Sequence, residues 1–188
     1  MRPGELRQAE WSEFDFDKAM WVIPAPKMKM RRAHKVPLSR QALALIEELQ
    51  EVSGHRRYVF PCMGKPKLAM SENAVNQALR RLGYPSGEMT AHGFRAMAAT
   101  LLNEMGQWNP DAIERQFAHQ DASSVRRAYA RGEYLDERIA MMQHWSDYLD
   151  ELREAAPAAR PPVDLKGKAK KGKPGRGRGR PPRTRAPR

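Results

Sequence analysis

The chain has 188 residues, which suits one domain of ordinary size with a short extension, and its net charge is +12. Its single cysteine, Cys62, excludes an intramolecular disulfide and a multi-cysteine zinc site. We expect Cys62 to be a small, buried packing residue. No stretch is long and apolar enough to cross a membrane and no apolar secretion signal is present, so the sequence predicts a soluble cytoplasmic protein.

Positive charge is concentrated at one end of the chain. Residues 157–188 hold 12 Lys and Arg side chains and one acid, Asp164, for a net charge of +11, whereas residues 1–156 have a net charge of +1. Residues 157–188 consist largely of Pro, Gly, Lys and Arg, which cannot bury enough apolar surface to offset chain entropy. The sequence therefore predicts a folded domain over residues 1–156 and a disordered basic tail over residues 157–188, with nucleic acid as the suggested partner.

The first part of the domain is predicted to combine a short helix with a small hairpin. Residues 2–9 are typical of the end or middle of a helix, which suggests that the chain is truncated at its start. Two strand-like runs, residues 21–24 and 35–38, flank a basic connection and predict an antiparallel hairpin. The basic residues of this connection are Lys27, Lys29, Arg31 and Arg32.

The rest of the domain is predicted to be mostly helical. Each helix begins near a residue that can cap its first turn or, in one case, accommodate a proline there. The predicted starting points are Ser39, Ser71, Thr90, Asn109 with Pro110, Ser123 or Ser124, and a position near Tyr134. Glycines are expected to close three of these helices, at Gly54, Gly83 and Gly106. An apolar stripe along the last helix is predicted from the spacing of Ile139, Met142, Trp145 and Leu149.

A histidine and an arginine three residues apart indicate a site for an anion. On a helix that begins at Thr90, His92 and Arg95 project from one face and can reach the same phosphate. Arginine holds two phosphate oxygens, histidine exchanges protons near neutral pH, and a tyrosine hydroxyl can attack phosphorus. With His119 and Tyr129 downstream, these residues predict phosphoryl transfer without a metal. A metallohydrolase is disfavoured because no cluster of carboxylates or further histidines accompanies the two histidines.

Five short segments together resemble the catalytic domain of the tyrosine recombinases, the integrases of phages and genomic islands. They are Arg2-Pro3-Gly4-Glu5-Leu6, Lys29 within Lys27-Met28-Lys29-Met30, the His92/Arg95 pair, His119 and Tyr129. Three further segments resemble the integrases of satellite phages in particular: Trp21-Val22-Ile23-Pro24-Ala25, His34-Lys35-Val36-Pro37-Leu38-Ser39 and Met141-Met142-Gln143-His144-Trp145. The resemblance extends over residues 1–150. It implies an α+β fold, mostly helical, with a small antiparallel sheet.

The resemblance also implies a role for each matching residue. Tyr129 would attack a DNA phosphodiester and form a 3′-phosphotyrosyl link, so that no cofactor and no metal are needed. Arg2 and Arg95 would hold the non-bridging oxygens of the phosphate, and Lys29 would protonate the leaving 5′-oxygen. Tyr134 is the rival nucleophile, but the ten-residue step from His119 to Tyr129 fits the family pattern better.

The remaining candidates assist these groups. His92 and His119 are expected to hydrogen-bond phosphate oxygens and to move the proton of the tyrosine, and Glu5 to orient Arg2 or a histidine. Lys27 would replace Lys29 if the alignment of the loop were shifted, and otherwise it would contact DNA. The other predicted DNA contacts are Arg31 and Arg32 in the loop and Arg178 and Arg180 in the tail. His34, His55 and His144 have no matching role and are expected at the surface or in packing.

The expected partner is double-stranded DNA at attachment sites, bound by a tetramer of this chain with no membrane involved. Because the beginning of the catalytic domain is missing from the sequence pattern, an inactive remnant is an open alternative. A second alternative is a non-catalytic DNA-binding protein whose Arg-Gly-Arg-Pro run at residues 178–181 acts as an AT-hook in a narrow minor groove. A third is a type IB topoisomerase reaction, which uses a similar set of residues.

Overall fold

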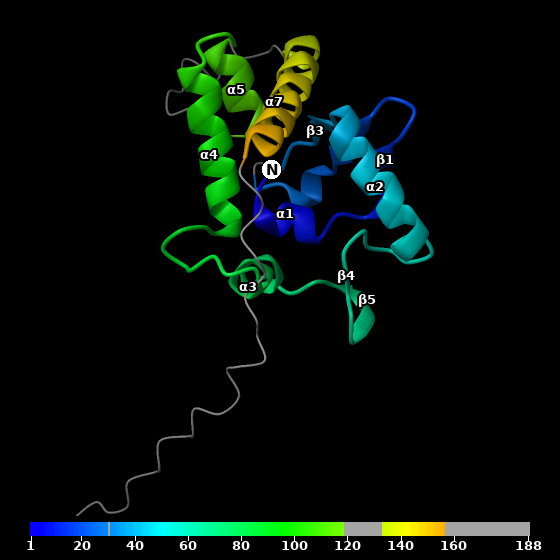
Figure 1. The fold of residues 1–188 in the computed structure, drawn as a ribbon. Helices are drawn as coiled ribbons and strands as arrows, with labels where there is room; N and C mark the ends of the chain where they lie inside the picture. Colours follow the sequence, from blue (N-terminus) through cyan, green and yellow to red (C-terminus); the bar gives the residue numbers. More distant parts are fainter. Residues whose placement is uncertain (30, 119–132, 157–188) are drawn as a thin grey trace, which may run out of the picture.

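The computed structural model describes residues 1–29, 31–118 and 133–156 (Figure 1). Its helices are α1 Pro3–Arg7, α2 Arg40–Ser53, α3 Ala74–Arg81, α4 Ala91–Glu104, α5 Pro110–Gln116 and α7 Leu135–Ala155. Its strands are β1 Phe14–Asp15, β2 Met20–Ile23, β3 His34–Pro37, β4 Pro61–Cys62 and β5 Lys65–Ala69. The fold is therefore α+β and mostly helical, as predicted. Among the described residues, no helix is long and apolar enough to span a membrane.

The predicted hairpin is confirmed and is extended by a third strand. Strands β1, β2 and β3 form an antiparallel sheet in this order, with Trp21 opposite Val36 and Ile23 opposite His34. Trp21 and Ile23 are buried because the pleat turns both toward the same face, while Val22 between them is exposed. The face that carries Trp21 and Ile23 therefore receives the first hydrophobic core.

This first core lies between the sheet, α1 and α2. Its fully enclosed residues are Ala9, Trp21, Ile23, Met28, Val36 and Val59. The helix α2 begins where predicted, because the Ser39 side chain accepts a hydrogen bond from the backbone N–H of Ala42. The stacked rings of Phe14 and Trp21, with centroids 5.4 Å apart, close the other side of the core.

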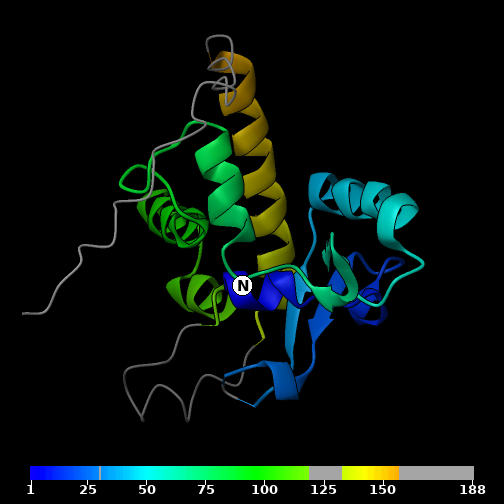
Figure 2. The ribbon, with the colours of Figure 1, turned by 90° about the horizontal axis from the view of Figure 1, so that it is seen from below.

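A second core joins the three helices α4, α5 and α7. It consists of Ala98, Leu102, Ile113, Phe117, Met141 and Trp145. The predicted caps are confirmed: Thr90 accepts from the N–H of Gly93, and Asn109 accepts from that of Asp111. Figure 2 shows these helices on one side of the molecule and the sheet with α2 on the other, so that α1 and the N-terminus lie between the two groups.

The buried face of α7 differs from the predicted stripe. Ile139 and Leu149 are 44% and 39% exposed, whereas Arg138 and Met141 are 1% and 0% exposed. The helix is rotated because the guanidinium of Arg138 finds hydrogen-bond acceptors in the interior, which an apolar spacing pattern cannot reveal. Of the predicted stripe, Trp145 is buried in the second core and the partly buried Met142 packs against it.

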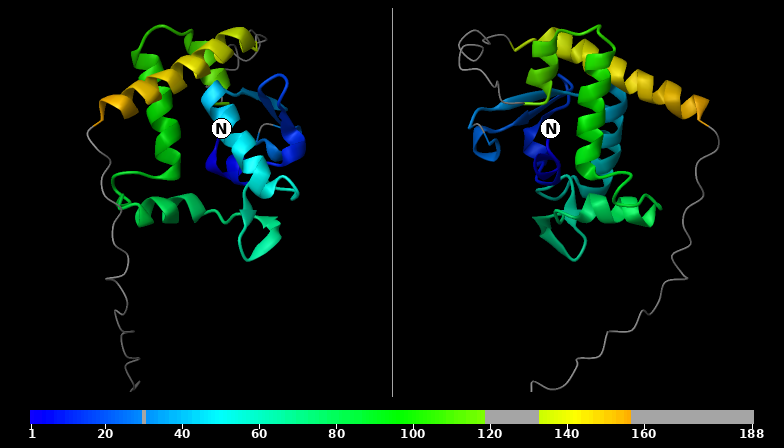
Figure 3. Two further views of the ribbon diagram at one scale, coloured as in Figure 1. Left: turned by 45° about the vertical axis from the view of Figure 1, so that its right-hand side comes forward. Right: turned by 90° about the vertical axis from the view of Figure 1, so that its left-hand side faces the viewer.

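Two further expectations were wrong around α3. This helix begins after Asn73 and not after Ser71, although the carbonyl of Ser71 accepts the N–H of Ala74. The segment before it forms the unexpected β4–β5 hairpin, in which Cys62 is partly exposed and not buried. In both views of Figure 3, α3 and this hairpin lie together at one end of the molecule.

His34 connects the two cores. This histidine on β3 is 7% exposed, and its Nε2 lies 3.2 Å from the carbonyl oxygen of Gln116 at the end of α5. Burial, followed by the positive charge of Arg138, lowers the pKa of His34 from 6.5 to about 4. The ring is therefore neutral at pH 7, and we assign its proton to Nε2, which donates to Gln116.

We expect the stability of the fold to decrease in acid through His34. Between pH 6.5 and about 4 the unfolded chain binds a proton at this residue that the folded chain excludes, so the unfolded state gains as the pH falls. A lowering of this size corresponds to about 3 kcal/mol of unfolding free energy, present above pH 6.5 and lost by pH 4. Urea unfolding followed by circular dichroism at several pH values measures it.

The variant His34→Gln provides the comparison, because the amide can still donate to the Gln116 carbonyl but does not titrate. The slope of its unfolding free energy against pH should be smaller over this interval, because about one proton fewer is bound on unfolding. If the two proteins lose stability in parallel between pH 6.5 and pH 4, the buried imidazole is not the cause.

Candidate active site

Arg95 lies one turn into α4 and is partly buried. Its Nη2 donates to the carbonyl oxygen of Phe117, and its guanidinium carbon lies 5.3 Å from the centroid of the Phe117 ring. Its Nη1 is also buried, but no hydrogen-bond acceptor reaches this atom among the described residues. A buried donor without an acceptor costs roughly 1–3 kcal/mol, and an anion that reached Nη1 would remove this cost.

Arg2 is the second cation of this region. It immediately precedes α1, and its Nη1 forms an ion pair with Glu5 Oε1 at 3.0 Å. The backbone N–H of Arg2 donates to the same carboxylate, so Glu5 fixes both the main chain and the side chain of Arg2. Glu5 is buried, which agrees with a carboxylate that orients Arg2 and not with a solvated one.

The fold brings Arg2 and Arg95 into electrostatic contact. Burial, followed by the positive charge of Arg2, lowers the pKa of Arg95, and the carboxylates of Glu5 and Glu114 act in the opposite direction. Two guanidinium groups close to each other repel, and an anion between them would remove that repulsion. These residues are 93 positions apart in the sequence, and the fold brings their charges close enough to interact.

His92 precedes Arg95 by one helical turn. It lies in the first turn of α4 and is exposed. Because the helix begins at Ala91, after the Thr90 cap, the spacing of three places the two side chains on one face, as predicted. The histidine is therefore accessible from solvent next to the partly buried arginine.

The two candidate lysines have different environments. Lys27 ends a short 3-10 turn (Ala25–Lys27) and its ammonium forms ion pairs with Glu13 and, at 2.7 Å, with Glu10. It also donates to the carbonyl oxygen of Gln8 at 2.8 Å. Lys29 follows the buried Met28 in the loop between β2 and β3 and is exposed. No hydrogen bond or ion pair of a described residue connects Lys29 with Arg2 or Arg95.

The carboxylates that hold Lys27 are themselves anchored. Glu13 accepts a hydrogen bond from the indole Nε1 of Trp21 at 2.9 Å, and Glu10 pairs with Arg57 at 2.8 Å. The hydrogen bond from Arg57, and then that from Lys27, lower the pKa of Glu10 to about 2. Lys27 therefore attaches the turn before Lys29 to the edge of the first core.

The remaining candidates fall into two groups. Arg31 and Arg32 are exposed in the same loop as Lys29, where they can reach a ligand from solvent. His119, Tyr129, Arg178 and Arg180 lie outside the described residues. Tyr134, the rival nucleophile, is the partly buried residue before α7 and has a left-handed backbone with φ of 46°.

Sequence reasoning missed a cluster of polar residues next to the site. Arg138 and Gln116 are buried together, with Arg138 Nε 2.8 Å from Gln116 Oε1, and His34 contacts the backbone of the same glutamine. One signal was present for His34, since it alternates with Val36 along a strand that has a packed face. Nothing in the local sequence indicated that Arg138 would be buried.

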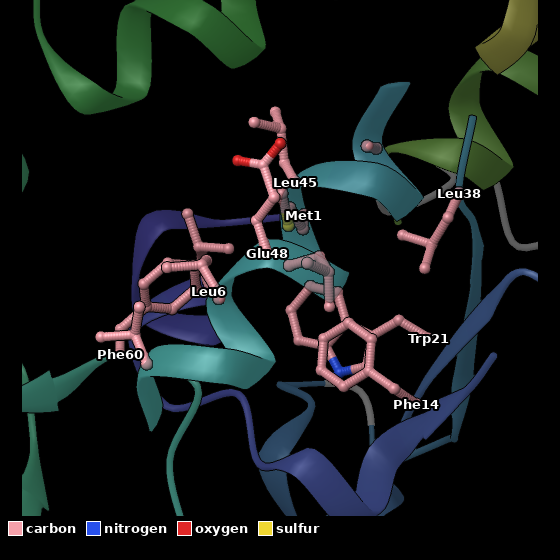
Figure 4. Close-up of a pocket in the computed structure, with 12 residues that line it drawn as sticks. Met1, Leu6, Phe14, Trp21, Leu38, Leu45, Glu48 and Phe60 are labelled. Atoms are coloured by element: carbon pink, nitrogen blue, oxygen red, sulfur yellow. The ribbon is translucent and has the colours of Figure 1, made fainter. Parts of the chain in front are cut away.

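An apolar groove on the other side of α1 does not suit an anion. It has a volume of about 520 Å³ and lies between α2, the sheet and the N-terminal residues (Figure 4). Apolar side chains line it almost throughout, among them Leu6, Trp21, Leu45 and Phe60, and the charged residue there is the acid Glu48. The candidate active site is therefore the region around Arg2, Arg95 and His92.

Comparison with known proteins identifies the family of the chain. Residues 1–135 match the phage integrase family. The chain is 48% identical over 164 residues to the integrase of Enterobacteria phage P4, covering 80% of this chain and 37% of that protein. It is also 48% identical over 146 residues to the prophage integrase IntA of Escherichia coli (strain K12), covering 78% and 35%. The chain thus spans little more than a third of the length of these relatives.

A solved structure, the crystal structure of XerA recombinase, aligns with a TM-score of 0.45 at 15% identity and covers 69% of this chain and 52% of that one. The family match covers residues 1–135. It includes every position predicted to be catalytic and more than half of the chain. The chain therefore belongs to the phage integrase family and contains a tyrosine recombinase catalytic domain.

Proposed function

We propose that this chain supplies the catalytic part of a site-specific DNA recombinase that acts through a phosphotyrosyl intermediate. The observation that carries this proposal is the buried Nη1 of Arg95, which has no acceptor among the described residues and lies within electrostatic reach of Arg2. A phosphodiester in this place would accept from both guanidinium groups and relieve their repulsion.

In the proposed reaction the phenol oxygen of Tyr129 attacks the phosphorus of a DNA phosphodiester. The new bond joins the tyrosine to the 3′-phosphate, and the bond from phosphorus to the 5′-oxygen breaks. His119 and His92 take up the proton of the tyrosine, and the 5′-oxygen leaves as a hydroxyl after protonation. Because the phosphoester is retained in the protein, a hydroxyl of a second DNA strand can reverse the reaction without ATP.

Arg2 and Arg95 are proposed to stabilise the charge that develops on the non-bridging oxygens. Donors fixed in place before the reaction lower the barrier without reorganisation, by roughly 3–4 kcal/mol for each donor. The ion pair with Glu5 supports this role for Arg2, since it holds the guanidinium in one orientation. The hydrogen bond to the Phe117 carbonyl does the same for Arg95.

We propose Lys29, and not Lys27, as the acid that protonates the leaving 5′-oxygen. Lys27 is bound by two carboxylates and a backbone carbonyl, so it has no free donor geometry for DNA. Lys29 is exposed, and the buried Met28 and the anchored Lys27 before it limit the freedom of its backbone. Arg31 and Arg32 in the same loop are proposed to contact neighbouring phosphates.

The proposed partner is double-stranded DNA at attachment sites, with four copies of the recombinase on two duplexes. Family membership supports the DNA partner, and the tetramer is what the resemblance of the site residues implies. We further propose that the basic residues 157–188 bind DNA phosphates without sequence preference, because they hold +11 of the net charge. An AT-hook contact through Arg178 and Arg180 would add a preference for A·T-rich duplexes.

The nucleophile can be identified by trapping. With a nicked suicide duplex that carries the attachment site, the chain should form a covalent adduct with DNA, and Tyr129→Phe should abolish it because the attacking oxygen is lost. Denaturing gel electrophoresis of labelled DNA measures the adduct. Tyr134→Phe, the matched control, should retain it, and an adduct that survives Tyr129→Phe would assign the nucleophile elsewhere.

Arg95→Ala should reduce the rate of adduct formation by roughly 10²–10³-fold, as expected for the loss of a preorganised donor to the reacting phosphate. The rate is measured in single turnover at saturating DNA. Arg40→Ala, which removes an arginine that is 80% exposed on α2, is the matched control and should leave the rate unchanged. Equal rates for the two variants would exclude Arg95 from the reaction.

Deletion of residues 157–188 tests the proposed role of the basic tail. Each phosphate that the protein neutralises contributes about −0.9 to the slope of log affinity against log salt on duplex DNA. The shortened protein should therefore bind non-specific DNA more weakly and with a smaller salt slope, while its circular dichroism spectrum and unfolding midpoint remain those of the folded domain. An unchanged slope would place the DNA-binding charge on residues 1–156.

A further inference from the structure

Arg138 is a buried cation whose described acceptors are all uncharged. It lies in the first turn of α7 and is 1% exposed. Its Nε donates to Gln116 Oε1 at 2.8 Å, its Nη1 to the carbonyl oxygen of Glu133 at 3.3 Å, and its Nη2 to the carbonyl oxygen of Lys35. One guanidinium therefore connects α5, β3 and Glu133, which lies two residues before α7.

Two of these acceptors stand on either side of residues 119–132. Gln116 is the last residue of α5, and Glu133 is the first described residue after this stretch. We propose that Arg138 is a positioning residue for catalysis, which sets the distance between the two ends of the stretch that carries Tyr129. This inference rests on the proposed function, since it presumes that Tyr129 is the nucleophile.

Strand β3 provides the common base for both ends. At one end, the neutral His34 contacts the carbonyl oxygen of Gln116 at 3.2 Å. At the other end, Lys35 Nζ forms an ion pair with Glu133 at 2.9 Å. Two consecutive residues of the strand thus hold the two ends independently of Arg138, and the Lys35 carbonyl joins Arg138 to the same strand. Gln116 and Glu133 are therefore each connected both to Arg138 and to strand β3.

The same contacts reach the candidate phosphate site. Phe117 follows Gln116 directly, and its carbonyl oxygen accepts from Arg95 Nη2. A shift of the Gln116 end would therefore move the carbonyl that orients Arg95. Through this neighbouring pair of residues, Arg138 influences both the phosphate-binding arginine and the approach of the nucleophile.

The chemistry of Arg138 fits a positioning role better than a purely stabilising one. Burial, followed by the positive charge of Arg115, lowers the pKa of Arg138 to about 10, so it remains charged at neutral pH. An apolar side chain of similar volume often packs in such a place at no loss of stability. A guanidinium, in contrast, directs several donors in one plane to three acceptors, which lysine cannot do.

Hydrogen–deuterium exchange can test whether Arg138 holds the two ends. In Arg138→Gln and in Arg138→Lys, amides of residues 116–118 and 133–136 should exchange faster, while amides of α2 should not change. Met141→Ala is the matched control, because it opens space in the second core one turn further along α7 without touching the acceptors of Arg138. If exchange at both ends is accelerated equally in Met141→Ala, the effect of the Arg138 variants is one of general packing, and the proposal is overturned.

The rate of adduct formation can test the consequence for catalysis. At saturating DNA, Arg138→Lys should form the adduct about 10- to 100-fold more slowly with unchanged DNA affinity, because the loss is one of alignment. Met141→Ala should react at the wild-type rate at a temperature where it is folded. A wild-type rate in Arg138→Lys would overturn the positioning role. If the unaltered chain forms no adduct, the proposed function fails, and the exchange experiment still decides whether Arg138 holds the two ends.

Discussion

The guanidinium of Arg138 must find acceptors for its donors inside the protein, and this requirement determines how the two cores meet. Its acceptors come from β3, from the end of α5 and from Glu133 shortly before α7, so these contacts constrain how the three elements approach one another. The rotation of α7 that buries Met141 follows from it. Hydrogen bonds to a buried charge are about twice as strong as neutral ones, which makes them effective constraints on geometry.

The candidate active site differs from the surroundings of Arg138, because one of its buried hydrogen-bond donors has no acceptor among the described residues. Arg95 has one buried donor without an acceptor among the described residues, and Arg2 adds repulsion. Such features lower the stability of the free protein, and an anion bound as proposed would restore that stability. All three donor nitrogens of the buried Arg138 thus have acceptors within the protein, whereas the partly buried Arg95 has one donor nitrogen without an acceptor among the described residues, and we propose that this donor binds phosphate.

Local signals in the sequence were sufficient for most of the fold. The caps Ser39 and Thr90 predicted where their helices begin, because the hydrogen bond from a nearby N–H to the cap side chain determines the first turn. Since the start of α4 was predicted correctly, the placement of His92 and Arg95 on one face of that helix was also predicted. The buried face of α7 and the partner of each lysine depend on residues far away in sequence. No periodicity reveals that Arg138 is internal, or that Lys27 is bound by Glu10 and Glu13.

If Arg95 binds a DNA phosphate as proposed, its donor without an acceptor makes the protein sensitive to the choice of buffer. Sulfate and inorganic phosphate carry the same tetrahedral oxygens as the DNA backbone, whereas chloride offers a single spherical charge. Because a guanidinium recognises oxygens in a plane, the two kinds of anion should not be equivalent at the same ionic strength. Oxyanions are then competitors for one defined position, beyond their general screening of charge, and the apparent strength of DNA binding depends on which counter-anion is present.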